Sequence, residues 1–252
     1  MVDDDPFATW FDALERRHLA DLTFSEVRRS VQTLSSIYVE RRDRLNTGAV
    51  LSGAGKRAAF ALFFAPLHFL LVREIVRALN ASIPQKIPLV DLGCGTGPAG
   101  AAWALETGRS TTIQGVDVNS WALEECRWNY RQLGIHGATR KVELKRFRLP
   151  TGTAVIAAFT INELDVENRA RFLREFLGIR QSGLPVLVVE PIARKLTEWW
   201  NDWTTEIVSA GGRADEWRFH VPLPERLALM DRAAGLDHRE ITGRSLWLPG
   251  TE

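Results

Sequence analysis

Hydrophobic and polar positions along the chain change their spacing near residue 85. Between residues 7 and 80, apolar side chains recur at intervals of three and four, and few segments have the features of a strand. This spacing is typical of amphipathic helices. The helices expected there cover 7–19, 24–38 and 58–79.

After residue 85, short apolar runs alternate with segments of helical spacing. The expected strands are 88–91, 112–117, 141–146, 153–159 and 185–190. The expected helices are 98–107, 120–133, 167–178 and 223–234, and 237–248 is closing strand material. Alternating strands and helices predict an α/β fold with a mostly parallel, doubly wound sheet. We therefore expect an N-terminal helical cap region, 1–85, followed by one α/β domain, 86–252.

The most informative segment joins the first expected strand to the helix after it. Two apolar residues lead into Asp91, and glycine then occupies alternate positions at Gly93, Gly95 and Gly97. Glycine lets the backbone turn sharply and lets a ligand approach it closely. The helix that follows offers free N–H groups at its first turn. The segment is therefore predicted to bind a nucleotide-type cofactor.

Asp91 bears on which cofactor this is. Residues 95–100 also match the dinucleotide fingerprint G-x-G-x-x-G. A carboxylate beside the loop would repel a diphosphate, whereas it suits a ligand that carries positive charge. S-adenosylmethionine (SAM) has a sulfonium and an α-ammonium group. SAM is therefore the expected cofactor, and an NAD-dependent oxidoreductase is the more distant alternative.

A second acid, Asp117, ends the next expected strand. In doubly wound nucleotide folds, an acid at the tip of the second strand accepts hydrogen bonds from the ribose hydroxyls. Asn119 and Ser120 follow it and are expected to cap the next helix. The two acids at this spacing support one cofactor site.

The pattern D-x-G-x-G-x-G at residues 91–97 resembles motif I of the class I SAM-dependent methyltransferases. The resemblance implies a Rossmann-like fold. It also implies direct displacement of the methyl group by an acceptor. The apolar N-terminal helices are expected to form a lid over the cofactor. The expected cofactor-binding residues follow the first, second and fourth strands: Asp91, Gly93, Cys94, Gly95, Gly97, Asp117, Val118, Asn119 and Phe159.

Polar residues also follow the fourth and fifth expected strands. Asn162 and Glu163 are the catalytic candidates, because an amide or a carboxylate there could orient a nucleophile or take its proton. Glu190 either has a similar role or anchors a turn. A strong base is optional, because the methyl group of SAM is already activated and positioning supplies much of the catalysis.

Four short motifs carry a narrower resemblance. Residues 36–42, 91–97, 162–164 and 189–191 together are similar to methyltransferase-like proteins associated with the small ribosomal subunit of mitochondria and bacteria. This implies a ribosome- or rRNA-associated assembly factor as an alternative function. The chain departs from that family because it lacks a cysteine cluster suited to an iron–sulfur centre.

Composition says little about which substrate or partner the protein binds. The 32 basic and 31 acidic residues balance, so bulk charge gives no reason to expect binding to nucleic acid or membranes. The five histidines have no metal-ligand spacing, so no metal is expected. The apolar run 58–72 is too short to span a bilayer, and the N-terminus lacks a signal-peptide pattern. We expect a soluble cytoplasmic protein that acts on a small molecule or on rRNA, in an oligomeric state left open.

Two further segments each have two interpretations. The basic residues after position 139 either contact phosphate or protect an exposed strand edge, and Phe147 among them is a candidate for stacking on adenine. The stretch 191–222 is expected to be a tryptophan-rich insertion. Its tryptophans either line a substrate pocket or anchor the insertion to the core. They are Trp199, Trp200, Trp203 and Trp217.

Overall fold

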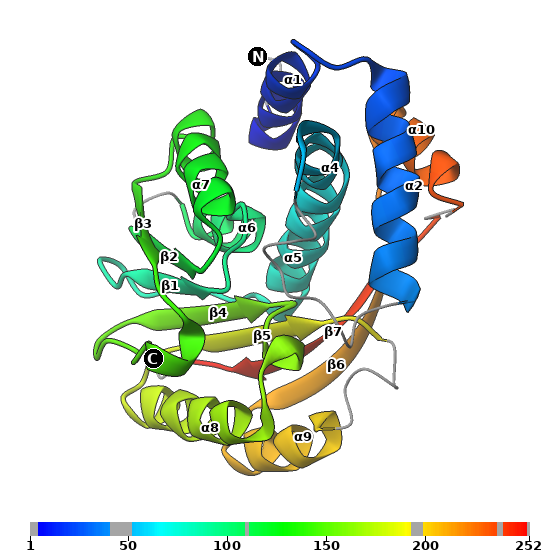
Figure 1. Ribbon diagram of the computed structural model, residues 1–252. Helices are drawn as coiled ribbons and strands as arrows, with labels where there is room; N and C mark the ends of the chain where they lie inside the picture. Colours follow the sequence, from blue (N-terminus) through cyan, green and yellow to red (C-terminus); the bar gives the residue numbers. More distant parts are fainter. Residues whose placement is uncertain (1–4, 41–51, 109–110, 193–198, 236–238, 251–252) are drawn as a thin grey trace. The chain divides into compact units, whose positions relative to one another are not determined.

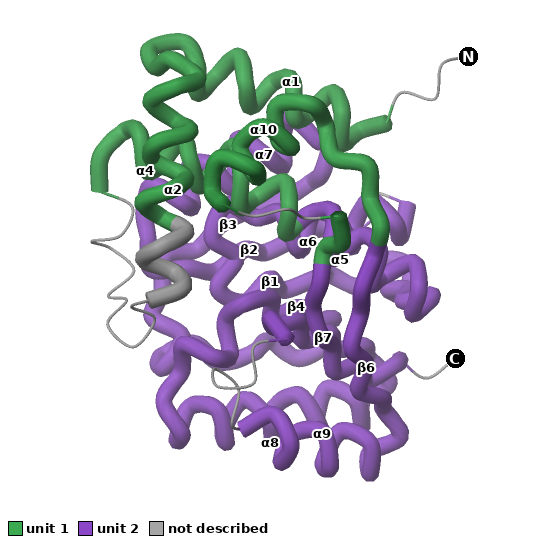
Figure 2. Tube along the Cα trace, turned by 90° about the vertical axis from the view of Figure 1, so that its right-hand side faces the viewer, with its two compact units in different colours: residues 1–68, 220–241 green, residues 69–219, 242–252 purple. Residues whose placement is uncertain are grey.

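The computed structural model describes residues 5–40, 52–108, 111–192, 199–235 and 239–250, with the backbone alone for 35–40. The chain divides into two compact units (Figure 2). Unit 1 comprises residues 1–68 and 220–241, and unit 2 comprises residues 69–219 and 242–252. The expected division into a helical cap region, 1–85, and a second domain, 86–252, stays a prediction.

Seven strands form one sheet in the described part of the chain, in the order β3-β2-β1-β4-β5-β7-β6 (Figure 1). Strands β1 to β5 pair in parallel, and β7 runs antiparallel to β5. The expected Rossmann-like, mostly parallel sheet is confirmed. The strands are β1 (Leu89–Leu92), β2 (Ile113–Asp117), β3 (Gly137–Lys141), β4 (Ala154–Ala158), β5 (Val186–Glu190), β6 (Arg213–Phe219) and β7 (Ile241–Leu248).

Helices cover both faces of this sheet. The helices α6 and α7 lie on one face, and α8 and α9 lie on the other (Figure 1). Every residue of β1, β4 and β5 is buried, as is usual for central parallel strands. The helices of unit 2 that follow β1 are α6 (Pro98–Glu106), α7 (Ser120–Gln132), α8 (Val166–Gln181) and α9 (Trp200–Ser209), with short 3₁₀ turns η3 (Leu144–Arg146) and η4 (Ile161–Glu163).

Unit 1 is helical and is built from two separate parts of the chain. Its helices are α1 (Pro6–His18), α2 (Phe24–Glu40), α4 (Ala54–Ala59), the π-helical turn η2 (Phe60–Phe64) and α10 (Glu225–Ala233). The Arg226 side chain of α10 pairs with Glu15 of α1 at 3.4 Å. The Gln32 amide of α2 donates to the Ala233 carbonyl at 2.6 Å. The lid role expected for the N-terminal helices stays a prediction.

The apolar run 58–72 belongs to a longer helix than the sequence indicated. Helix α4, η2 and α5 (Ala65–Leu79) continue one another over Ala54–Leu79, which is 26 residues with a mean hydropathy of 1.8 in its most apolar window. By length and composition alone this helix could cross a membrane. However, 67% of that window is buried inside the protein, as in the core helix of a globular fold.

Two expected elements differ from the structure. The third strand was expected at 141–146 but lies at 137–141, and residues 144–146 form η3 instead. It is an edge strand with exposed side chains, so it has no apolar run that would reveal it. The stretch 191–222 contains α9 and β6, and β6 extends the sheet beyond β7.

Candidate active site

The loop between β1 and α6 depends on glycine at two positions. Gly93 and Gly97 have φ angles of +62° and +83°, in the left-handed region that side chains disfavour. A Cβ atom on Gly93 would overlap the Thr160 side chain. A Cβ atom on Gly97 would lie 2.6 Å from the Cys126 sulfur. The alternating glycines therefore allow a tight loop that packs directly against its neighbours.

Asp91 lies in the middle of the sheet and faces the first turn of α6. Its Oδ2 accepts a hydrogen bond from the Gly100 N–H at 3.1 Å, and the residue is only 1% exposed. Burial raises the pKa of Asp91 to about 7, the Gly100 N–H opposes this, and the charge of Asp117 adds to it. The first turn of α6 is therefore already faced by a carboxylate. A diphosphate bound in the manner of a dinucleotide site would meet that carboxylate.

Asp117 ends β2 and binds two backbone groups of the loop region. Its Oδ2 accepts from the Gly95 N–H at 3.0 Å, and its Oδ1 accepts from the Asn119 N–H at 2.8 Å. Burial raises the pKa of this carboxyl group, and these N–H groups oppose the shift. Asn119 caps α7 through its bond from the Ala122 N–H, as expected. The fixed carboxylate keeps acceptor capacity for ribose hydroxyls.

Two other expected cofactor residues, Val118 and Cys94, differ in the exposure of their side chains. Val118, beside Asp117, is an exposed apolar side chain, which suits contact with a flat base. Cys94 is buried, its N–H donates to the Val116 carbonyl, and its carbonyl accepts from Gly97. Burial raises the pKa of the Cys94 thiol well above its usual value. Cys94 therefore shapes the loop through its backbone.

The segment after β4 has a strained residue, Phe159. Its φ is +57°, which is unusual for a bulky side chain, and its N–H donates to the Val189 carbonyl at 2.8 Å. The next residue, Thr160, donates its hydroxyl to the Leu92 and Ala158 carbonyls, each at 3.0 Å. Such strain is common near functional sites.

The structure brings Asn162 and Glu190 together at the carboxyl edge of the sheet. Glu190 Oε1 accepts from the Asn162 backbone N–H at 3.1 Å, and Trp199 Nε1 donates to the Asn162 side-chain oxygen at 3.4 Å. Glu163 is close enough for its charge to raise the pKa of Glu190. On sequence alone Glu190 was a weaker candidate than Asn162, although an acid at the end of a buried apolar strand was visible there.

A comparison with protein families identifies this arrangement. Residues 89–183 match the family described as methyltransferase domain. This segment contains the glycine loop, both acids and the turn with Asn162 and Glu163. Over this segment, the chain is similar to SAM-dependent methyltransferases.

Solved structures similar to this methyltransferase have low sequence identity to it. A SAM-dependent methyltransferase from Aquifex aeolicus is 15% identical with a TM-score of 0.48, and the match covers 73% of this chain and 93% of that one. The magnesium protoporphyrin IX methyltransferase from Synechocystis PCC 6803, with bound SAM, is 10% identical with a TM-score of 0.46, at 86% and 95% coverage. A comparison with curated proteins finds no match.

The cofactor of the methyltransferase is SAM, and the protein is an enzyme that transfers the methyl group of SAM to an acceptor. The donor set fits SAM: a fixed carboxylate at β2, exposed Val118 beside it, and the buried Asp91 carboxyl near the loop. The NAD alternative fits less well, because the buried Asp91 carboxyl group already accepts from the Gly100 N–H in the first turn of α6, where a diphosphate would be held. The individual roles of the expected site residues stay predictions.

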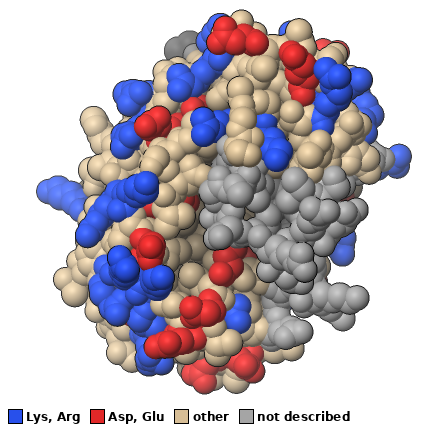
Figure 3. All heavy atoms as spheres, in the orientation of Figure 1, with Lys and Arg blue, Asp and Glu red and all other residues tan. Residues whose placement is uncertain are grey.

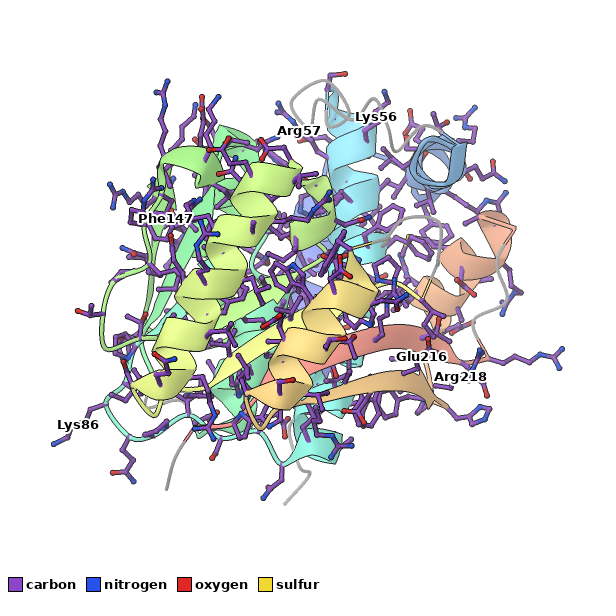
Figure 4. All side chains as sticks on the ribbon, turned by 90° about the horizontal axis from the view of Figure 1, so that it is seen from below. Lys56, Arg57, Lys86, Phe147, Glu216 and Arg218 are labelled. Carbon is purple, nitrogen blue, oxygen red and sulfur yellow. The ribbon has the colours of Figure 1, made fainter. Side chains whose placement is uncertain are left out.

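Two expectations about aromatic residues are resolved in the methyltransferase. Phe147 (labelled in Figure 4) is 2% exposed and belongs to the hydrophobic core, so it does not stack on adenine. Trp200 and Trp203 are buried in the same core, where Trp203 meets the Phe176 ring edge-on at 5.9 Å. Trp217 bonds Ser245 of β7 at 2.8 Å. Trp200 and Trp203 therefore anchor α9 to the core, and Trp217 joins β6 to β7.

The narrower resemblance to ribosome-associated proteins stays a prediction. Of its four motifs, residues 91–97, 162–164 and 189–191 converge on the carboxyl edge of the sheet. The motif 36–42 lies outside the described side chains. The described residues contain no group of three or more potential metal ligands.

Proposed function

We propose that the methyltransferase acts on RNA and that one exposed basic surface, the basic strip, holds the phosphate backbone. The strip lies within residues 127–148, which contain seven basic residues and a single acid, Glu143, a net charge of +6. The whole chain has a net charge of only +1. The strip consists of Arg127, Arg131, Arg140, Lys141, Lys145, Arg146 and Arg148, all exposed.

The basic strip is continuous and reaches the cofactor edge. The Arg127 guanidinium donates to Thr139 of β3 at 2.8 Å, which joins the α7 part of the strip to the β3 part. Lys141 stands opposite Asp117 in the register of β3 and β2. Figure 3 has blue spheres on its left-hand side, the side on which Figure 1 draws β3. A polyanion lying along the strip would therefore end near the ribose-binding acid.

The charges of the strip are only partly neutralised. Lys145 and Arg146 pair with Glu143 at 3.1 and 3.7 Å. Arg148 donates to backbone carbonyls, and Lys141 donates to the Ser120 hydroxyl, so these contacts leave the positive charge in place. Clustered Lys and Arg side chains bind phosphates and release counterions. This charge asymmetry is the observation that carries the proposal.

The roles of individual residues follow from their positions. Asp117 and the glycine loop hold the adenosyl part of SAM, while Asp91 contributes negative charge near the loop. Asn162 and Glu163 orient the nucleophilic atom of the acceptor. SAM supplies a methyl group that is already activated, so orientation of the acceptor is the main catalytic contribution of the protein. We keep the cytoplasmic location within this proposal, supported by the two buried free thiols.

RNA binding is tested by fluorescence anisotropy with a labelled single-stranded RNA over a range of salt concentrations. Contacts with four phosphates would give a log–log slope of about −3. The double variant Arg140→Glu/Arg148→Glu should weaken binding at least tenfold and flatten the slope. A matched control, Arg28→Glu/Arg29→Glu on exposed α2 positions, should leave both unchanged. Equal binding by both double variants would exclude the strip.

Transfer is tested with SAM carrying a tritiated methyl group and rRNA from small ribosomal subunits. Label in the RNA, reduced by the strip variant and not by the control, supports the proposal. Binding without transfer would support the assembly-factor alternative instead. Transfer to small molecules alone would refute RNA as the acceptor.

A further inference from the structure

The turn η4 holds both catalytic candidates but has no cap of its own. Its N-cap residue is Thr160, whose side chain makes no capping hydrogen bond to the turn. The Thr160 hydroxyl instead donates to carbonyls at the ends of β1 and β4. The first N–H groups of the turn therefore need an acceptor from elsewhere.

Glu190 supplies this acceptor from the neighbouring strand. Its Oε1 accepts from the Asn162 N–H at 3.1 Å, and its carboxyl group also bonds the Ile161 N–H. Glu190 is the last residue of β5, and β5 pairs directly with β4. Glu190 is 1% exposed, so the hydrogen bonds of its carboxyl group are shielded from water.

We propose that Glu190 is a positioning residue for methyl transfer: it caps η4 from β5 and so fixes Asn162 and Glu163 relative to the methyl group of SAM. The inference rests on the proposed role of those two residues toward the acceptor. It does not depend on the acceptor being RNA. The hydrogen bonds of the Glu190 carboxyl group go to η4 and not to the glycine loop or Asp117, so its effect should fall on the acceptor side.

A second contact holds Asn162 from the opposite direction. Trp199 Nε1 donates to the Asn162 side-chain oxygen at 3.4 Å, while the Asn162 backbone is held by Glu190. Trp199 is itself fixed by edge-on contact with the Trp203 ring, at 4.8 Å between centroids. The fluorescence of Trp199 should therefore respond to a change in the conformation of η4.

The charged groups that face Glu190 come from two elements. Glu163 lies on η4, and Arg244 stands opposite Glu190 in the register of β7 and β5. Burial raises the pKa of Glu190 to about 8, and the charge of Glu163 adds to the shift while Arg244 opposes it. Glu190 is therefore mostly protonated at neutral pH. Its ionisation above pH 8 should alter the environment of Trp199.

The first experiment needs no acceptor. Tryptophan emission of the full chain is recorded from pH 6 to pH 10, and hydrogen exchange of the segment 159–165 is followed by mass spectrometry. The wild type should show a transition near pH 8 that is absent in Glu190→Gln and in Trp199→Phe. Exchange in the segment should speed up at least tenfold in Glu190→Ala and stay slow in Glu190→Gln, whose amide oxygen still accepts the N–H groups.

The second experiment separates positioning from general support of the fold. Glu190→Ala should bind SAM within twofold of the wild type but lose at least tenfold in kcat with the acceptor, with KM for SAM unchanged. Glu190→Gln should recover most of that loss. Glu167→Ala, an exposed carboxylate on α8, is the control. If Glu190→Ala fails to fold, Glu190→Asp is used instead. This substitution shortens the side chain by one methylene and so moves the carboxyl group away from η4.

The outcomes distinguish the two proposals. Unchanged exchange in Glu190→Ala, or a fall in SAM affinity equal to the fall in kcat, would overturn the positioning role. Faster exchange together with failure of transfer to RNA by the wild type would retain the capping of η4 and refute only the RNA acceptor.

Discussion

Asp91 gives the most direct test of how charge is buried beneath the cofactor loop. Asp91 is 1% exposed, and burial raises the pKa of its carboxyl group from 3.8 to about 7 in the folded protein. Between those values the folded protein keeps a proton that the unfolded chain has released, so stability falls as the pH rises. A shift of about three units corresponds to at most about 4 kcal/mol, fully lost above pH 7.

The substitution Asp91→Asn removes this charge but keeps an oxygen that accepts the Gly100 N–H. At pH 8 we expect the variant to be more stable than the wild type by about 2 kcal/mol, which is roughly half of the maximum of about 4 kcal/mol. For a chain of this size, that gain raises Tm by ~4–8 °C. The gain should be much smaller at pH 4.5, where the folded wild type is protonated. The same variant should bind SAM about tenfold more weakly, because it lacks a negative charge near a cationic ligand.

Thermal unfolding followed by circular dichroism at both pH values measures the first effect, and calorimetric titration with SAM measures the second. Asp21→Asn, at an exposed position, is the control and should leave both unchanged. A gain of equal size at pH 4.5 and pH 8, or a loss of stability at pH 8, would show that the buried charge is not the source of the effect.

Two further substitutions test the cofactor side. Asp117→Ala removes the acceptor for the Gly95 N–H and, on our assignment, for the ribose hydroxyls, so the affinity for SAM and for S-adenosylhomocysteine should each fall at least tenfold in calorimetric titrations; unchanged affinity would refute the ribose role. Gly97→Ala places a methyl group 2.6 Å from the Cys126 sulfur, whereas Gly152 has a similar positive φ and nothing within 4 Å. Both alanine variants incur the backbone strain of about 1–2 kcal/mol, but Gly97→Ala should lose ~1–3 kcal/mol more in urea unfolding. Equal losses would mean that crowding at the loop is unimportant.

The sequence predicted the central strands because they are buried on both faces. β1, β4 and β5 are short apolar runs, so the acids Asp91 in β1 and Glu190 at the end of β5 are conspicuous. β3 was misplaced because its side chains are exposed. β6 was not expected because exposed and half-buried residues alternate along it, with charged residues among them, so it lacks an apolar run.

The cofactor loop was predictable because its chemistry is local. Asp91 and the glycines lie within seven residues, and their spacing alone indicates a strand, a turn and a helix. The cap on η4 was not predictable, because it joins Asn162 to a residue 28 positions away through the pairing of β4 with β5. The burial of Phe147 likewise depends on how the chain turns after β3, which the local pattern does not specify.

Unit 1 is assembled from two chain segments that are far apart in the sequence, and this affects its folding during synthesis. Its helices α1, α2 and α4 are made first, but α10, which bonds α1 and α2, lies between β6 and β7. At ~5–20 residues per second, the N-terminal helices leave the ribosome on the order of ten seconds or more before their last partner is synthesised. During that interval α10 does not yet cover the apolar faces of these helices, so the nascent chain can bind chaperones or aggregate through them. A chain truncated before residue 220 would leave unit 1 permanently incomplete.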